Sequence, residues 1–241
     1  MTTVEIPKGN TALQVNETAY EMLRPSLGEG QRVLDLPCGE GEWLGFLKSA
    51  HPRSKYIGAD LRADLPNFDF EFLSLDVTRE DLPWKELDLV TSISGIVCFG
   101  NHLRFFREAH RALKPGGKFL VTNDNHWTLR DRMHFLLFGT YKRFPLVYRP
   151  SEGNTQATTI MTTVDALEKA GFKVEDVRYT SARFEDYLWV PFAIVLWTLQ
   201  GLAVAAAAGG KNPRFSSDFI RRLYPLRALW CRHYLILARK I

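Results

Sequence analysis

Residues 33–43, which read V-L-D-L-P-C-G-E-G-E-W, constrain the fold more than any other stretch of this chain. A short apolar run ends in Asp35, two glycines follow one residue apart, and a stretch compatible with a helix begins after them. This order predicts a strand, a tight turn and a helix start. Glycine lacks a Cβ atom, so Gly39 and Gly41 permit positive φ and close approach of a ligand to the backbone. In open α/β sheets ligands bind outside the carboxyl ends of the strands, so we expect a cofactor at this turn.

The chemistry of the turn favours a cofactor that carries positive charge. The dinucleotide fingerprint G-x-G-x-x-G binds pyrophosphate at a helix N-terminus, but the third glycine here, Gly45, lies one residue late. Asp35, Glu40 and Glu42 would repel a pyrophosphate and suit S-adenosylmethionine (SAM), which has a sulfonium and an ammonium group. The stretch resembles motif I of the class I SAM-dependent methyltransferases, V-L-D-x-G-C-G-x-G, with Pro37 where that family usually has its first glycine.

This resemblance implies an α/β fold with a doubly wound, seven-stranded, mostly parallel sheet whose last strand is antiparallel. The L-K-P-G-G sequence at 113–117 and the A-G-F sequence at 170–172 are similar to turns that precede two of the family's strands. We expect a single methyltransferase domain over residues 1–241, with helical insertions at about 127–150 and 181–231. The sequence predicts further strands at 55–61, 70–77, 87–94, 173–180 and 233–240.

Acidic residues close three consecutive predicted strands, at Asp35, Asp60 and Asp76. Asp60 lies about twenty residues past the glycine turn, where an acid can accept hydrogen bonds from ribose hydroxyls. By resemblance, Asp76 would accept a hydrogen bond from the adenine amino group. The cofactor site that the resemblance implies consists of Asp35, Pro37, Gly39 and Gly41 on the methionine side, Asp60 and Leu61 at the ribose, Asp76 and Val77 at the adenine, and Ile93 and Ser94 beside the methyl donor.

The catalytic residues are less constrained by the sequence. Many family members read Leu-Glu-His after the fourth strand, whereas this chain reads Ile-Val-Cys at 96–98, with His102 as one substitute. Asp124 and His126 follow the fifth strand, so His126 is our candidate base and Asp124 would orient it. The alternative is that both are polar loop residues that shape the pocket, since methyl transfer depends mainly on positioning. His233 is expected only to begin the last strand.

Composition excludes several other classes of protein. The 241 residues carry a formal net charge of +4 and a pI near 9.0, which permits an anionic partner without indicating one. The three cysteines lie far apart, so we expect no metal site. Neither a D/N-P-P-Y motif nor a Pro-Cys nucleophile motif after the fourth predicted strand is present, because Cys98 follows Val97, and we therefore expect no nucleic-acid substrate. The N-terminus has no apolar signal-peptide core, which predicts a cytoplasmic protein.

Two segments outside the predicted sheet are unusually apolar. Residues 187–210 contain no charged side chain and are long enough to span a bilayer, but both flanking strands belong to one sheet, so a single crossing is excluded. Residues 127–149 mix aromatic and basic side chains, as membrane-surface helices do. Residues 127–149 can lie on a membrane surface, form a lid over the active site whose cations bind an anionic substrate, or simply pack as a helix. Residues 187–210 can dip into one leaflet of a membrane, line an apolar substrate tunnel, form a dimer interface or pack against the domain. The pattern from Arg130 to Gly139 is also similar to insertions in bacterial glycan and polysaccharide methyltransferases.

Together these features predict a SAM-dependent methyltransferase. We expect O-methylation of an amphipathic, lipid-linked or glycan acceptor, with possible peripheral contact at the inner face of a membrane through 187–210. Two alternatives stay open. One is a non-catalytic protein of the same fold that acts as a partner at a membrane, and the other is a nicotinamide-dependent oxidoreductase.

Overall fold

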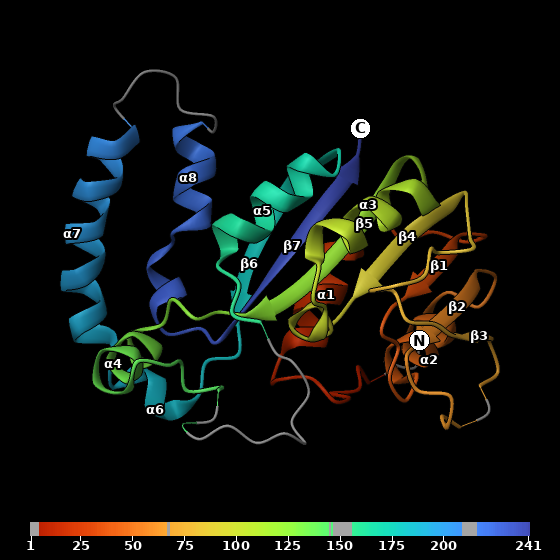
Figure 1. Ribbon diagram of the computed structural model, residues 1–241, viewed down its shortest axis with the longest axis horizontal. Coiled ribbons are helices and arrows are strands. Elements are labelled where there is room, and N and C mark those ends of the chain that lie inside the picture. Colours follow the sequence, from red (N-terminus) through yellow and green to blue (C-terminus); the bar gives the residue numbers. More distant parts are fainter. Residues whose placement is uncertain (1–4, 67, 145, 147–155, 209–215) are drawn as a thin grey trace.

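A computed structural model describes residues 5–66, 68–144, 146, 156–208 and 216–241. Seven strands form one sheet in the order β3-β2-β1-β4-β5-β7-β6, and β7 is antiparallel to both of its neighbours (Figure 1). The predicted fold class and its antiparallel last strand are confirmed. The strands are β1 (Arg32–Asp35), β2 (Lys55–Asp60), β3 (Glu71–Ser74), β4 (Leu87–Ser92), β5 (Leu113–Asp124), β6 (Phe172–Thr180) and β7 (His233–Lys240).

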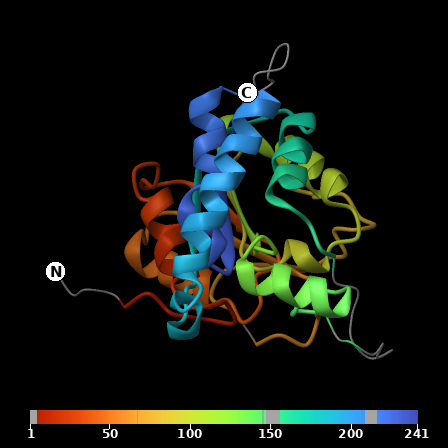
Figure 2. The same cartoon turned by 90° about the vertical axis from the view of Figure 1, so that its left-hand side faces the viewer.

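Helices cover both faces of the sheet, as the view in Figure 2 shows. On one face of the sheet, the helix α1 contacts β5, β6 and β7. On the opposite face, α3 contacts β5, α5 contacts β6, and the two helices pack against each other. The helices are α1 (Val15–Leu23), α2 (Glu42–Ala50), η1 (Ile96–Cys98), α3 (His102–Ala112), α4 (Leu129–Phe138), α5 (Ile160–Lys169), α6 (Phe184–Tyr187), α7 (Val190–Ala208), α8 (Ser217–Leu223) and η2 (Leu226–Leu229).

The apolar residues of the strands divide between two cores because successive side chains in a strand point to opposite faces. Val33 and Leu120 belong to the core beneath α1 and α2. Leu34 and Val121, each the next residue in its strand, belong to the core beneath α3 and α5. Both faces are therefore buried, which is why the central strands are apolar throughout rather than alternating with polar residues.

The third strand is shorter than the sequence predicts. The strand β3 ends at Ser74, so Asp76 lies two residues past its end and not at its last position. Asp35 and Asp60, by contrast, are the last residues of β1 and β2, as predicted. Only two of the three acids therefore end a strand.

The segments expected to hold insertions contain α4 and the run from α6 to η2. In Figure 1, α4 and α6 lie near the end of the sheet to which β5 points, and α7 stands beside the sheet. None of the helices in the described part of the chain meets the length and hydropathy that a membrane crossing requires.

Candidate functional site

The glycine turn, α1 and the N-terminal arm enclose a cavity of about 260 Å³ at the carboxyl ends of β1, β2 and β4. We call this the cofactor cavity. The predicted residues Asp35, Pro37, Gly39, Asp60, Ile93 and Ser94 all line it, so the fold brings together residues that lie almost sixty positions apart in the sequence. Gly9, Asn10, Thr11, Asn16, Cys38, Glu40, Glu42, Trp43 and Arg62 complete its wall.

Asp35 is a buried carboxylate in this wall, with 2% of its surface exposed. The pKa of Asp35 is raised to about 8, chiefly because the carboxylate is buried. A hydrogen bond from the Thr91 hydroxyl lowers the pKa, whereas the negative charge of Asp60 raises it. The Thr91 Oγ1 atom lies 2.6 Å from Asp35 Oδ1. Among the described residues no basic side chain forms an ion pair with Asp35. A cationic ligand in the cavity would relieve this unfavourable burial.

Three other polar atoms of the wall are buried and have no hydrogen-bond partner among the described residues: Asn16 Oδ1, Trp43 Nε1 and Ser94 Oγ. Buried polar groups are normally hydrogen-bonded, so unpartnered atoms around one cavity indicate that a ligand completes them. Ser94 also has a φ of 57°, which is uncommon for a residue other than glycine, and its amide donates to Thr122 Oγ1 at 2.7 Å. Donors, acceptors and a buried carboxylate fit the amino-acid part of SAM.

The carboxylate of Asp60 accepts hydrogen bonds from two backbone amides. The Gly39 amide donates to Asp60 Oδ2 at 3.0 Å, and the Arg62 amide donates to Asp60 Oδ1 at 3.1 Å. The Arg62 guanidinium lies 3.5 Å from Asp60 and also pairs with Glu40 at 3.2 Å. Asp60 therefore fixes the conformation of the glycine turn, in addition to the ribose contact that the resemblance implies.

Four predicted cofactor residues do not line this cavity. Gly41 adopts a φ of 77° at the start of α2, and a Cβ there would contact the Phe68 ring. Leu61 is 69% exposed. The Asp76 carboxylate accepts hydrogen bonds from the amide and hydroxyl of Thr78, and Val77 is buried in the core beneath α3 and α5. The structure thus gathers most of the residues expected at the methionine and ribose, except Gly41 and Leu61, and leaves both residues expected at the adenine outside this cavity.

A second cavity, of about 330 Å³, adjoins the first and shares Asn10, Thr11 and Ser94 with it. We call it the acceptor cavity. It contains Asp124 and His233, which are paired in register between β5 and β7. His233 Nε2 lies 2.9 Å from Asp124 Oδ1.

The Asp124 carboxylate also pairs with Arg143, whose Nε atom lies 2.7 Å from Asp124 Oδ2. Burial tends to raise the pKa of Asp124, but the hydrogen bond to His233 and the charge of Arg143 outweigh it and lower the pKa. Asp124 is therefore a stable anion that can fix the orientation of the His233 ring.

The predicted contact between Asp124 and His126 is replaced by this pair. His126 does not line the acceptor cavity; its ring stacks on Tyr141, with 4.7 Å between centroids, and its Nε2 atom is buried without a partner. Burial lowers the pKa of His126. The negative charges of Asp124 and Asp131 act to raise this pKa, but the effect of burial is larger. His102, the other candidate, contacts the Ile96 carbonyl oxygen at 2.6 Å.

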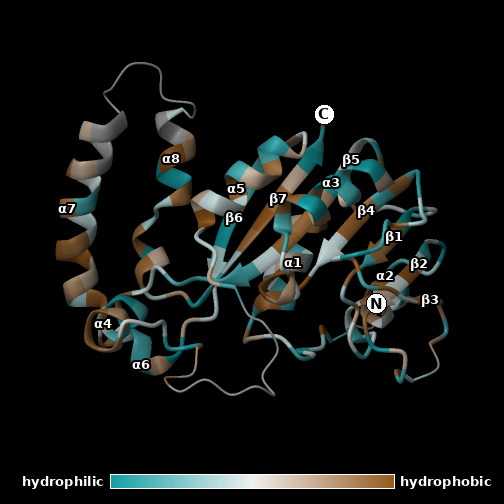
Figure 3. Ribbon diagram, viewed as in Figure 1, coloured by the Kyte–Doolittle hydropathy of each residue, from teal (hydrophilic) through white to brown (hydrophobic). Residues whose placement is uncertain are grey.

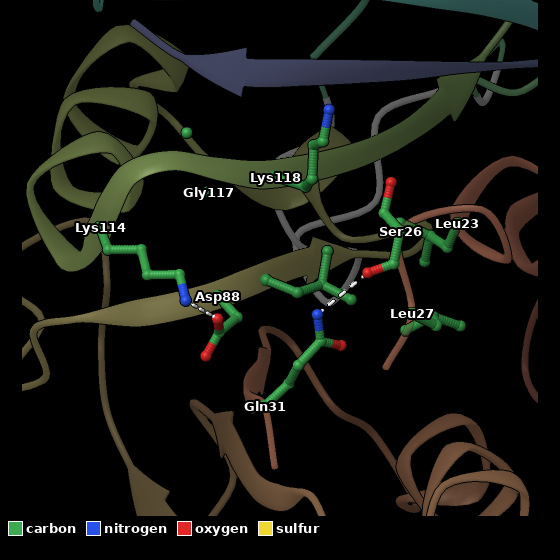
Figure 4. A pocket seen from close by; sticks show the side chains of 10 residues that line it. Leu23, Ser26, Leu27, Gln31, Asp88, Lys114, Gly117 and Lys118 are labelled. Carbon is green, nitrogen blue, oxygen red and sulfur yellow. Dashed lines mark hydrogen bonds and ion pairs between the residues drawn. The ribbon is translucent and has the colours of Figure 1, made fainter. Parts of the chain in front are cut away.

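Another cavity lies at the amino ends of the strands, near the starts of β1 and β4 (Figure 4). We call it the hollow. There Lys114 forms an ion pair with Asp88, and the Gln31 side chain donates to the Ser26 carbonyl oxygen at 2.9 Å. These pairs satisfy the polar groups of the hollow from within the protein. Ligands of open α/β sheets bind outside the carboxyl ends of the strands, so this hollow is not our candidate site.

The sequence model of a family described as the methyltransferase domain matches residues 13–177. The chain belongs to the SAM-dependent methyltransferases. The match covers α1, the glycine turn and the strands from β1 into β6, and it includes every lining residue of the cofactor cavity except Gly9, Asn10 and Thr11 of the arm. This membership supports SAM as the cofactor and favours the methyltransferase interpretation over the nicotinamide-dependent one.

Individual curated relatives of this methyltransferase match less than half of its length. A phthiotriol/phenolphthiotriol dimycocerosates methyltransferase of Mycobacterium ulcerans is 34% identical over 107 residues, which cover 39% of this chain and 38% of the relative. A fatty-acid O-methyltransferase of Mycolicibacterium smegmatis is 32% identical over 103 residues, which cover 39% of this chain and 38% of that enzyme. The matched part is thus less than half of either curated relative.

A crystal structure of a SAM-dependent methyltransferase from Mesorhizobium loti has the same fold, with a TM-score of 0.57 and 18% identity. The superposition covers 92% of this chain and 97% of the other. At this identity the likeness concerns the fold alone, and it extends the agreement beyond residue 177 to the last strand.

Sequence reasoning missed His233 and the residues of the arm and of α1 that close the cofactor cavity. A signal for His233 was available, because an antiparallel last strand must begin beside the carboxyl end of its parallel neighbour. Asn16 also carried a signal, as a polar residue on the buried face of a helix. It is 2% exposed and its amide donates to the Pro7 carbonyl oxygen at 2.8 Å, which ties the arm to α1.

Proposed function

We propose that this methyltransferase transfers the methyl group of SAM to an oxygen atom of an amphipathic acceptor that is presented at a lipid surface. The observation that carries the proposal is the junction of the two cavities: the cofactor cavity adjoins a second cavity that holds a paired histidine and carboxylate. SAM supplies an electrophilic methyl group. The residues of the chain bind it, orient the acceptor and accept the proton.

Asp35 and Gly39 are assigned to the positively charged methionine part of the cofactor, and Asp60 to its sugar. Gly39 presents open space on its Cα, since a Cβ built there has no neighbour within 4 Å. Ser94 lines both cavities and therefore lies where cofactor and acceptor meet. Positioning of the two reactants at this junction is the main contribution that we expect the protein to make.

His233 is the proton acceptor that we propose for a hydroxyl acceptor, with Asp124 as its orienting partner. A carboxylate that holds one imidazole nitrogen fixes the ring and stabilises its protonated form. The pair lines the acceptor cavity, and His126 does not. This assignment replaces His126 as the candidate base and keeps Asp124 in the orienting role.

The amphipathic nature of the acceptor is supported by apolar side chains that lie exposed on α4 and α7. Figure 3 shows hydrophobic residues along both of these helices. Phe192, Val195, Leu199 and Leu202 of α7 are each between 59% and 68% exposed. Among the residues of this helix whose burial is described, only Ala193 is fully buried, and it packs on Leu129 of α4 and Leu229. A contiguous apolar surface of this kind marks a site of interaction. Exposed Arg183 and Lys142 nearby suit an anionic lipid surface.

Two named relatives bear on the same point. One is named for dimycocerosates and the other for fatty acids, which are both lipids. A glycan acceptor stays a prediction from the resemblance of residues 130–139.

The test is methyl transfer from SAM labelled on its methyl group, with the purified chain and three kinds of acceptor. These are a free fatty acid, a long-chain alcohol and a water-soluble sugar, each supplied with and without anionic vesicles. We expect label in the fatty acid or the alcohol, with a higher rate on vesicles. Binding of SAM without transfer to any of them would favour a non-catalytic partner role, and transfer to the sugar alone would contradict the amphipathic acceptor.

A further inference from the structure

A third cavity, of about 250 Å³, continues from the acceptor cavity and shares Asp124, Arg143, Arg183 and His233 with it. We call it the outer cavity. Five of its lining residues are Lys or Arg and only two are Asp. A cavity with this excess of positive charge favours an anionic occupant.

Part of this positive charge is neutralised within the protein. Arg232 pairs with Asp186 at 2.7 Å and with Glu185 at 2.7 Å. Arg143 pairs with Asp124 at 2.7 Å. These two arginines have structural partners, and they do not explain why further basic residues lie around the same cavity.

Of the remaining three basic residues, two form no ion pair in the described part of the chain and the third forms a longer one. Lys142 and Arg183 form no ion pair with an acidic side chain in the described ranges of the chain. Arg130 reaches Asp131 only at 3.4 Å, and its Nε atom is buried without a hydrogen-bond partner. The Asp131 carboxylate already accepts from the Thr128 hydroxyl at 2.6 Å. A buried guanidinium N–H without an acceptor is unfavourable unless a ligand supplies one.

We propose that the outer cavity binds an oxyanion of the acceptor, a phosphate or a carboxylate, through Arg130 and Arg183. This inference rests on the proposed function, because it places the anion beside the acceptor cavity. Arg183 lines both cavities, so a group bound to it remains next to the reacting oxygen. Guanidinium groups bind carboxylates and phosphates in a planar, two-point geometry. The acceptor would therefore carry a negative charge close to its reacting group, and an apolar portion.

The test uses three short-chain probes, each with an eight-carbon chain: octyl phosphate, octanoate and octyl glucoside, each below its micellar concentration. Each is titrated calorimetrically into the purified chain, with and without S-adenosylhomocysteine. Inorganic phosphate alone is a fourth titrant and separates free phosphate from the amphiphile. The variants are Arg130→Gln and Arg183→Gln. Arg53→Gln is the matched control, because it removes the same charge from an exposed turn that precedes β2, at the amino ends of the strands and away from the outer cavity.

We expect octyl phosphate or octanoate to bind, and each of the two variants to weaken that binding about tenfold, as loss of one charge-assisted hydrogen bond does. Arg53→Gln should leave it unchanged. The melting temperature and the affinity for S-adenosylhomocysteine should be the same in all variants, which shows that each is folded. Tighter binding of octyl phosphate than of inorganic phosphate would identify an amphiphilic anion as the ligand.

Three results would overturn the inference: no binding of either anionic amphiphile, equal binding of octyl glucoside, or binding that is insensitive to both arginine variants. Failure of S-adenosylhomocysteine to bind would instead overturn the proposed function. Because the probes are also titrated without it, the two failures are distinguishable.

Discussion

Asp124 and His233 face each other between β5 and β7, with His233 Nε2 at 2.9 Å from Asp124 Oδ1. They are separated by more than one hundred residues in the chain. Their pairing depends on the direction of β7, since only an antiparallel strand begins beside the carboxyl end of β5. The last strand therefore contributes a polar group to the site in addition to completing the sheet.

Replacement of His233 by Gln is expected to lower kcat by about 100-fold on a hydroxyl acceptor, because removal of a general base typically has an effect of this size. The KM for SAM should change little, since His233 does not line the cofactor cavity. Steady-state rates at varied SAM and varied acceptor check both. His51→Gln, at the end of α2, is the control. An unchanged kcat in the His233 variant would show that His233 has only a structural role.

Asp35 makes the folded protein sensitive to pH. Its pKa is about 8 in the folded state, well above the ordinary value for Asp. The folded state therefore binds more protons than the unfolded state between about pH 4 and pH 8, and the free energy of unfolding falls as pH rises through that range. Replacement of Asp35 by Asn removes this pH-dependent contribution to the free energy of unfolding. We expect the melting temperature of the wild type to drop more than that of Asp35→Asn between pH 6 and pH 8.

Binding of SAM should release a proton from Asp35 near neutral pH, because a cation in the cavity favours the ionised carboxylate. Calorimetry in buffers with different ionisation enthalpies measures this release directly. SAM should release more protons than S-adenosylhomocysteine, which lacks the sulfonium charge. Asp35→Asn should bind SAM more weakly and release none. Identical proton release in the wild type and the variant would contradict the assignment of Asp35 to the cofactor.

Pro37 and Gly95 form a complementary pair beneath the cofactor cavity. A Cβ built on Gly95 would overlap the ring of Pro37. Gly95→Ala should therefore destabilise the protein by about 1–3 kcal/mol, the usual effect of overpacking. Combining it with Pro37→Gly, which removes the ring, should recover most of the loss. Denaturant unfolding of the two single variants and the double variant measures the coupling, and additive effects would refute it.

The exposed apolar surface of α7 is expected to mediate binding to anionic vesicles. Replacing Phe192 and Leu199 with Glu should abolish flotation with such vesicles, because it places two negative charges in an apolar, lipid-facing surface. Both side chains are largely exposed, so the melting temperature should change little. Ile241→Glu, at the exposed C-terminus, should float like the wild type. Unchanged flotation of the double α7 variant would assign this surface to another partner.

Much of the fold was predictable because its signals are local. The glycine turn, the acids that end β1 and β2, and the turn before β6 each occupy a few consecutive residues, and the strand pattern of the family orders them. The L-K-P-G-G sequence at 113–117 does not precede the fifth strand as predicted but lies inside β5, where the register of its pairing with β4 shifts. The end of β3 was misplaced because the alternation of residues 70–77 continues past Ser74 into the turn that Asp76 forms with Thr78.

The site was predictable only where one strand end determines the position of a residue. Asp35 and Ser94 are placed by the strands that precede them, whereas Asp124 needed a partner from the far end of the chain. Its contact with His233 depends on strand pairing, and that of Asn16 with the arm depends on how α1 packs. Neither contact leaves a local pattern, so residues close in sequence, such as His126, were favoured instead.

The most direct measurement of the central claim is a calorimetric titration of the purified chain with S-adenosylhomocysteine, with NAD as the matched control. The account predicts binding of S-adenosylhomocysteine in the micromolar range, weakened in Asp60→Ala because that change frees the glycine turn, and no heat with NAD. Binding of NAD, or no binding of either compound by a folded protein, would contradict the assignment of the cavity at the carboxyl ends of β1, β2 and β4 to SAM.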